Sequence, residues 1–162
     1  MVEDVLAKFE YTNIKCSLAD FEFGNFEICH LKSVNRTYKY MEMKLNLNKP
    51  VTKVKANIAI FKKFNGYKPF LYNITVDGCR FLKNPKSYPV FSYFYRFFST
   101  YSNMNHTCPF YDYVWVDKLP GSFVNELVTK VLPVPDGDYM FDTNWYTDEV
   151  LRVTISVYGK IF

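Results

Sequence analysis

Cysteines carry the most specific chemistry in the sequence, at Cys16, Cys29, Cys79 and Cys108. An even number of cysteines in a short chain is typical of a disulfide framework, and four cysteines allow three pairings. We favour Cys16–Cys29, which would join the first two predicted strands, and Cys79–Cys108, which would close the base of an aromatic segment. A loop of the second size contributes roughly 3 kcal/mol of stability. The spacings contain no C-x-x-C pair and fit no zinc pattern, so we predict no metal site.

Glycan acceptors are the second chemical signal. Three N-x-T sequons begin at Asn35, Asn73 and Asn105. Together with the cysteines they predict an extracellular, secreted protein. Residues 1–8 carry charges where a signal peptide has its apolar core, so we expect that a signal peptide has already been removed. No apolar run approaches the roughly 18 residues of a membrane span, so we predict no transmembrane segment.

Residues suited to catalysis are few and isolated. His30 follows Cys29 directly, and His106 lies inside a sequon. Ser122 lacks the G-x-S-x-G pattern of a nucleophile elbow. Asp136 and Asp138 follow Pro135 in a segment that turn chemistry explains. We therefore predict no catalytic residue, no enzyme activity and no cofactor.

Composition and charge narrow the function further. Of the 162 residues 49% are hydrophobic and 20% aromatic, and only six are glycine, which argues against Gly-rich nucleotide loops. Residues 49–86 hold nine Lys/Arg and one acid, whereas residues 109–162 hold eight acids and four Lys/Arg. The basic part is explained most simply by solvated strand faces. Anionic lipid headgroups or an acidic partner are the alternative. Disulfides and glycans make nucleic acid a rare partner, and we predict none.

Alternating hydrophobicity predicts about eight strands. The Asn65-Gly66 pair predicts a hairpin between two of them. The predicted strands cover residues 9–15, 26–31, 38–47, 54–60, 70–77, 110–116, 139–145 and 151–158. Turn signals every ten or so residues place these strands in one mostly β domain, a β-sandwich over residues 1–162.

The segment between Cys79 and Cys108 interrupts this pattern. Eight aromatic residues lie between Tyr88 and Tyr101. Helical spacing predicts a helix from about Pro89 to Tyr101, an insertion whose stripe is Phe91, Phe94, Phe98 and Tyr101. A strand remains an alternative at this aromatic density. A short helix is also predicted over residues 122–131, with Phe123, Leu127 and Val131 on one face.

Several runs of sequence resemble a known family. They are LKSVNRTYKY at 31–40, NGYKPFLYN at 65–73, YSNMNHTCP at 101–109 and GDY at 137–139. These runs resemble a large insect family of small secreted proteins of unknown function related to the ML lipid-recognition domain. The resemblance implies an immunoglobulin-like two-sheet sandwich that holds a lipid between its sheets, and some insect relatives are tied to chemosensation. The family pattern often has a histidine after the Cys-Pro pair, which Phe110-Tyr111-Asp112-Tyr113 lacks.

Two functions remain open for the aromatic segment. In the first, it is one wall of an apolar pocket for a lipid or other apolar small molecule, which the protein carries or presents, in a chemosensory or co-receptor role. The predicted pocket residues are Ile58, Ile60, Phe70, Tyr72, Ile74, Phe91, Phe94, Phe98 and Tyr101. In the second, these rings fill the core, and the protein is an extracellular interaction module or receptor ligand. A cell-surface receptor is then the candidate partner.

Overall fold

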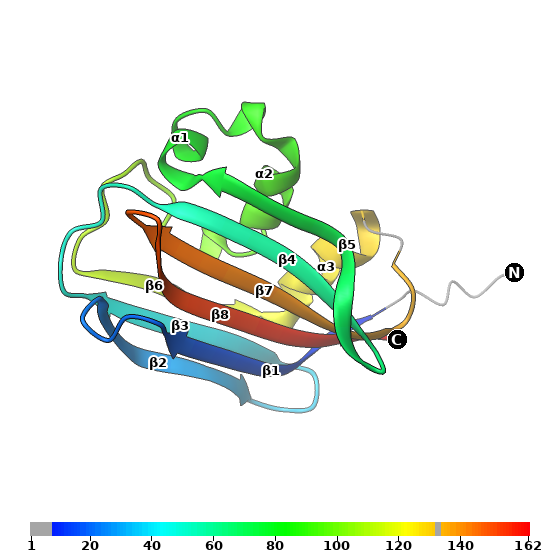
Figure 1. The fold of residues 1–162 in the computed structure, drawn as a ribbon. Coiled ribbons are helices and arrows are strands. Elements are labelled where there is room, and N and C mark those ends of the chain that lie inside the picture. The colour runs from blue at the N-terminus through cyan, green and yellow to red at the C-terminus, as the bar shows by residue number, and fades with distance from the viewer. Residues whose placement is uncertain (1–7, 132–133) are drawn as a thin grey trace, which may run out of the picture.

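Two antiparallel β-sheets pack face to face in the computed structural model, which describes residues 8–131 and 134–162 (Figure 1). The large sheet has the order β1 (Phe9–Leu18), β8 (Val150–Ile161), β7 (Gly137–Thr147), β4 (Lys55–Phe64) and β5 (Gly66–Asp77). The small sheet has the order β2 (Gly24–Ser33), β3 (Lys39–Leu47) and β6 (Tyr113–Pro120). The predicted mostly β, two-sheet sandwich is confirmed.

Side-chain alternation places one face of each strand in the core. In β3, Met41, Met43 and Leu45 are at most 5% exposed, as the sequence period predicts. In β5, Phe70, Tyr72 and Ile74 are half-buried while the residues between them are exposed, so Asn73 points outward. The β4–β5 hairpin turns at Asn65 and Gly66, and Gly66 adopts a φ of 89° that favours glycine.

The first two strands are neighbours in sequence but belong to different sheets. β1 pairs with β8, and β2 pairs with β3, so the first two predicted strands do not pair with each other. Each is an edge strand of its own sheet, and Cys16–Cys29 joins them. The disulfide therefore ties the two sheets together. Both favoured cysteine pairings, this one and Cys79–Cys108, are confirmed.

Helical segments follow β5 and β6. They are α1 (Gly78–Lys83), η1 (Pro85–Ser87), α2 (Pro89–Tyr95), η2 (Ser99–Tyr101) and α3 (Gly121–Val131). Figure 1 shows α1 and α2 beside β5, while α3 lies toward the end of the sandwich that holds the C terminus. No helix within the described residues is long and apolar enough to cross a membrane.

The helix predicted for residues 89–101 is shorter than expected. α2 ends at Tyr95, and a turn separates it from η2. The amides of Phe97 and Phe98 donate to the carbonyls of Phe94 and Tyr95, three residues earlier, so the backbone tightens after the helix. Phe97 and Phe98 pack, partly buried, against the core in this tightened turn. Helix α1 was not predicted.

Helix α3 also buries a different face from the predicted one. Val124 and Val128 are 5% and 7% exposed, whereas Phe123 and Leu127 are only half-buried. The side chain of Val131 lies outside the described residues. Phe123 instead packs edge-on against Tyr101, with ring centroids 5.1 Å apart. The space inside the sandwich therefore meets the valine face of α3.

Candidate functional site

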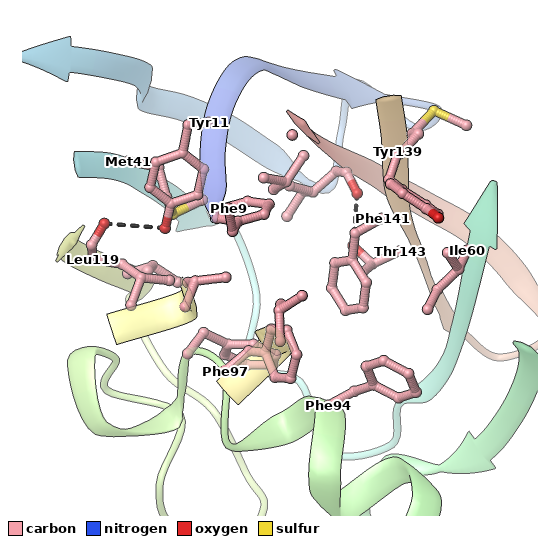
Figure 2. Close-up of a pocket in the computed structure, with 18 of the residues that line it drawn as sticks. Phe9, Tyr11, Met41, Ile60, Phe94, Phe97, Leu119, Tyr139, Phe141 and Thr143 are labelled. Atoms are coloured by element: carbon pink, nitrogen blue, oxygen red, sulfur yellow. Dashed lines mark hydrogen bonds between the residues drawn. The ribbon is translucent and has the colours of Figure 1, made fainter. Parts of the chain in front are cut away.

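Two cavities lie between the sheets. The first has a volume of about 140 Å³ and the second about 100 Å³. The first lies between the two sheets, α3 and the aromatic segment, and Figure 2 shows the rings of Phe94 and Phe97 closing one side of it. The second lies beneath α1 and is lined by residues from α1, α2, both sheets and the strand connections, among them Phe81, Phe91 and Leu45.

Inward-facing strand residues build the first cavity. β7 contributes Phe141, Thr143 and Trp145, three alternate residues of one face. β3 contributes Met41 and Met43 from the opposite sheet by the same alternation. Other wall residues come from β1, β4, β6, β8, α3 and the aromatic segment. They are Phe9 and Tyr11 of β1, Ile60 of β4, Val116 and Leu119 of β6, Ile155, Val157 and Ile161 of β8, Val124 and Val128 of α3, and Phe94, Phe97 and Phe98 of the aromatic segment.

The polar side-chain atoms of Tyr11, Tyr139, Thr143 and Trp145, which line the first cavity, all form hydrogen bonds with other atoms of the protein. The Tyr11 hydroxyl donates to the Leu119 carbonyl at 3.1 Å, and the Tyr139 hydroxyl donates to the Pro135 carbonyl at 2.6 Å. Burial raises the pKa of both phenols. The Trp145 indole N–H donates to Thr143 Oγ1, which itself donates to the Ile155 carbonyl, each at 2.9 Å. The wall thus presents hydrocarbon and ring surface to anything inside it.

A close backbone contact shapes the wall at Phe9. Its ring lies against Gly159, where a Cβ would be 2.1 Å from the Phe9 Cε1 atom. Both residues line the first cavity. Any side chain at position 159 would push the ring, so glycine there sets the position of Phe9.

The aromatic segment is partly packed core and partly cavity wall. Phe94 is 1% exposed and its ring lies 5.5 Å from that of Tyr72. Phe81 and Phe91 meet edge to face at 4.8 Å. The Phe97 ring stacks on Phe141, with 6.1 Å between centroids. The same rings pack against neighbours and border empty space, so the segment is part of the core and part of the cavity wall.

Two tyrosine hydroxyls fasten the segment. Tyr93 donates to the Leu127 carbonyl of α3 at 2.7 Å, and Tyr95 donates to the Met104 carbonyl at 2.8 Å. Burial raises the pKa of Tyr93 to about 12 and also raises that of Tyr95. Cys79–Cys108 closes the segment at its base. The aromatic segment, which forms this wall of the cavity, is therefore held in place by two hydrogen bonds and a disulfide.

The predicted pocket residues divide into four groups. Ile60 and Phe94 line the first cavity, Phe91 lines the second, and Phe98 lines both. The other five predicted residues line neither cavity. They are Ile58, Phe70, Tyr72, Ile74 and Tyr101.

Packing explains why those five residues lie outside the cavities. Ile58 is completely buried in the cluster beneath α1 and α2, against which Tyr72 and Ile74 also pack. Phe70 packs against Phe64 and Tyr139 near the β4–β5 hairpin. Tyr101 packs on α3, as described above. Strand alternation identified the correct face, but it does not indicate where along that face the packing leaves a void.

Most residues that line the cavities were not predicted. Phe97 lies beside the stripe of an ideal helix and is turned inward only because the helix ends. Met43 and Trp145 show strand alternation, which predicts burial but not a cavity. Met104 lies after η2, in a stretch without regular secondary structure, so no hydrophobic periodicity predicts its burial. Three-dimensional packing alone brings these residues together.

A buried glutamate and the two histidines lie outside the cavities. Glu42 is 6% exposed and accepts a 3.0 Å hydrogen bond from the Trp115 indole, with His30 Nε2 at 3.6 Å. His106 Nδ1 lies 2.7 Å from the Thr107 carbonyl. Among residues 8–131 and 134–162, no three His, Cys, Asp or Glu side chains gather as a metal site would require.

All three sequon asparagines are exposed. Asn73 Oδ1 accepts a 2.8 Å hydrogen bond from Asn57, and Asn35 Oδ1 accepts bonds from Thr37 and from the Tyr38 amide. These bonds engage the amide oxygen and not the nitrogen to which a glycan attaches. Glycosylation at Asn35, Asn73 and Asn105 stays a prediction.

Comparison with known proteins gives one family. A family model described as a protein of unknown function, DUF1091, matches residues 56–141, which span β4 to the middle of β7 and include the whole aromatic segment. No curated protein matches the chain.

Proposed function

The chain belongs to the DUF1091 family of proteins of unknown function, and we propose that it binds a lipid or other apolar small molecule between its two sheets. The observation that carries the proposal is the 140 Å³ cavity, whose polar wall atoms are all hydrogen-bonded within the protein. An engineered cavity of similar size, about 150 Å³ and lined by apolar side chains, stays dry and binds benzene.

We propose that the protein carries or presents this ligand and does not change it chemically. Close-packed interiors leave few voids larger than a water molecule, and each void costs stability. Two such voids side by side in one sandwich are better explained by an occupant than by incomplete packing. The resemblance to ML lipid-recognition proteins supports the same position for a ligand, between the sheets.

We also propose that the protein is secreted. Two disulfides are compatible with an extracellular protein, and three exposed sequon asparagines add support. In that setting the protein would carry an apolar molecule through water, in a chemosensory or co-receptor role. The interaction-module alternative has weaker support, because the most exposed large apolar side chains, Phe21, Phe64, Leu71 and Tyr111, belong to different loops and strands.

Native mass spectrometry tests the proposal. Protein secreted from insect cells is measured before and after organic extraction, and the extracted protein is then titrated with 1-hexanol in a calorimeter. We expect a co-purifying apolar molecule, and saturable binding of 1-hexanol after its removal. Absence of both would overturn the proposal.

A matched pair of variants locates the binding. Val128→Phe adds a ring to the wall of the first cavity, where Val128 is 7% exposed. Val150→Phe makes the same change at a surface position that is 47% exposed. We expect Val128→Phe to abolish 1-hexanol binding and Val150→Phe to leave it unchanged. Equal binding by both variants would place the ligand elsewhere.

A further inference from the structure

The two cavities share part of their walls. Five residues border both of them: Met43, Phe98, Met104, Trp145 and Ile155. Met43 comes from β3 of the small sheet, Trp145 and Ile155 from β7 and β8 of the large sheet, and Phe98 and Met104 from the segment after α2. These side chains thus form a partition that crosses the interior from one sheet to the other.

One side of the partition is fixed. The Trp145 indole donates to Thr143 Oγ1 at 2.9 Å, which holds the ring against β7. Ile155 is β-branched and 9% exposed, so it has little rotamer freedom. The large sheet therefore supplies a rigid half of the partition.

The other side consists of side chains that can rotate. Methionine is unbranched with three rotatable bonds and adapts to irregular space, and two of the five residues are methionines. The Met104 backbone is held by the Tyr95 hydroxyl at 2.8 Å, but its side chain borders open space on two sides. Rotation of Met43, Phe98 and Met104 would join the cavities without moving a strand or breaking a hydrogen bond.

Cavity size limits the shape of the ligand. Sites for drug-sized molecules have about 300–1,000 Å³, which exceeds either cavity here. A rigid multi-ring molecule therefore fits neither cavity and cannot be divided between them. A flexible unbranched chain can pass a narrow opening and fill both, and the wall offers it no polar partner.

We propose that the two cavities are halves of one binding channel for a single unbranched hydrocarbon chain, and that Met43, Phe98 and Met104 form the gate between the halves. This inference rests on the proposed function and specifies its ligand class. A cavity near 150 Å³ holds a benzene-sized ligand, so the 140 Å³ half takes about six carbons, the 100 Å³ half about four, and the whole channel about ten. Any polar end of the ligand lies outside the channel.

A chain-length series tests the channel. Oxidised full-length protein is titrated calorimetrically with 1-alkanols from about six to about fourteen carbons. Each buried methylene should tighten Kd about fourfold, and we expect this gain to continue past about six carbons and to stop at about ten. A gain that stops at about six carbons would mean that the chain stays in one cavity, and the inference would be wrong.

Variants of the gate test which residues open it. Met43→Ile and Met104→Ile replace a flexible side chain by a β-branched one of similar volume. Both residues also line the first cavity, so Kd for 1-hexanol should change as well. The result expected of a gate is that the gain in affinity from longer chains disappears. Phe98→Ala should have the opposite effect, because it widens the opening: the chain length at which 1-alkanol affinity stops rising should increase.

The matched control is Met41→Ile, because Met41 lines only the first cavity. It should change Kd for short and long chains by the same factor and leave the length optimum in place. A loss confined to long chains in this control would contradict the gate, and so would unchanged chain-length profiles in all three gate variants. Thermal melting confirms that each variant is folded.

The proposed function and this inference fail in different ways. If no 1-alkanol of any length binds, the proposed function is wrong. If 1-hexanol binds but longer chains gain nothing, only the channel is wrong.

Discussion

At the scale of single residues, the position of one ring depends on a glycine. A Cβ at position 159 would lie 2.1 Å from Cε1 and 2.5 Å from Cζ of Phe9, and both distances require the ring to move. We expect Gly159→Ala to lower the free energy of unfolding by about 1–3 kcal/mol, the usual cost of overpacking, and to weaken 1-hexanol binding as the ring enters the cavity. Urea denaturation and calorimetry measure the two effects.

The control for this prediction is a second substitution. Phe9→Leu removes the ring that meets the new methyl group, so Gly159→Ala should cost less in the Phe9→Leu background than in the wild type. Equal costs in both backgrounds would show that the penalty arises elsewhere.

The second prediction for a single residue concerns the Tyr93 hydroxyl. Tyr93→Phe removes the 2.7 Å hydrogen bond to the Leu127 carbonyl while keeping the ring contacts with Phe94 and Phe97. We expect a loss of about 0.5–1.5 kcal/mol in the free energy of unfolding at neutral pH, measured by urea denaturation.

The same variant predicts a pH dependence. Burial raises the pKa of Tyr93 to about 12, whereas an unfolded tyrosine titrates near about 10. The folded state therefore favours the protonated phenol, and this contribution is complete below pH ~10 and is lost as pH rises through about 12. The stability difference between wild type and Tyr93→Phe should shrink over that interval. A difference that stays constant or grows would contradict the raised pKa.

At the scale of elements, a disulfide holds the aromatic segment to its base. Cys79 and Cys108 are 29 residues apart and enclose η1, α2 and η2. Removing the crosslink with the double substitution Cys79→Ala/Cys108→Ala should cost about 3–4 kcal/mol on the chain-entropy model. We expect hydrogen exchange to accelerate in residues 78–101 more than in β7 and β8, because the segment loses a tie that the sheets do not use.

The other disulfide is the control for that measurement. Cys16 and Cys29 join the edge strands β1 and β2, far in sequence from the aromatic segment. Cys16→Ala/Cys29→Ala should accelerate exchange in β1 and β2 instead. If both double variants loosen the same residues, the disulfides do not act on separate elements.

Across the large sheet, polar side chains keep the outer face hydrophilic. Asn57 of β4 donates to Asn73 and Thr75 of β5, and accepts a hydrogen bond from Asn144 of β7. The network continues through Asp142 and then Ser156 of β8. The inner face of this sheet thus borders cavities, whereas its outer face carries this hydrogen-bonded polar network.

At the scale of the whole molecule, an occupied interior should be more stable than an empty one. A ligand that binds only the folded state stabilises it by about 2.7 kcal/mol at a free concentration of a hundred times Kd. We therefore expect 1-decanol to raise the melting temperature in a concentration-dependent manner, as measured by scanning calorimetry. The Val128→Phe variant should melt at the same temperature with and without 1-decanol. A ligand-induced decrease for the wild type would indicate binding to the unfolded chain.

Much of the fold could be predicted from local sequence. Alternation in β3 and β5, the Asn65-Gly66 turn and the cysteine pairing all follow from short-range rules, and the structure agrees with them. The site could be predicted only in part. Ile60, Phe91, Phe94 and Phe98 border the cavities, but Ile58 and Phe70 pack tightly elsewhere. A periodic pattern indicates which face is buried, and it contains no information about voids within that face.

By itself, the sequence determined the mostly β class and the presence of an aromatic insertion, because backbone periodicity acts locally. It favoured the two disulfides among three possible pairings. Tertiary structure alone decided that β1 and β2 join different sheets, that α2 ends at Tyr95, and that Met43, Phe98 and Met104 meet between two cavities. Each of these depends on how distant side chains share one volume. A cavity is the space that packing leaves over, so it is a property of all its walls together and of no single segment.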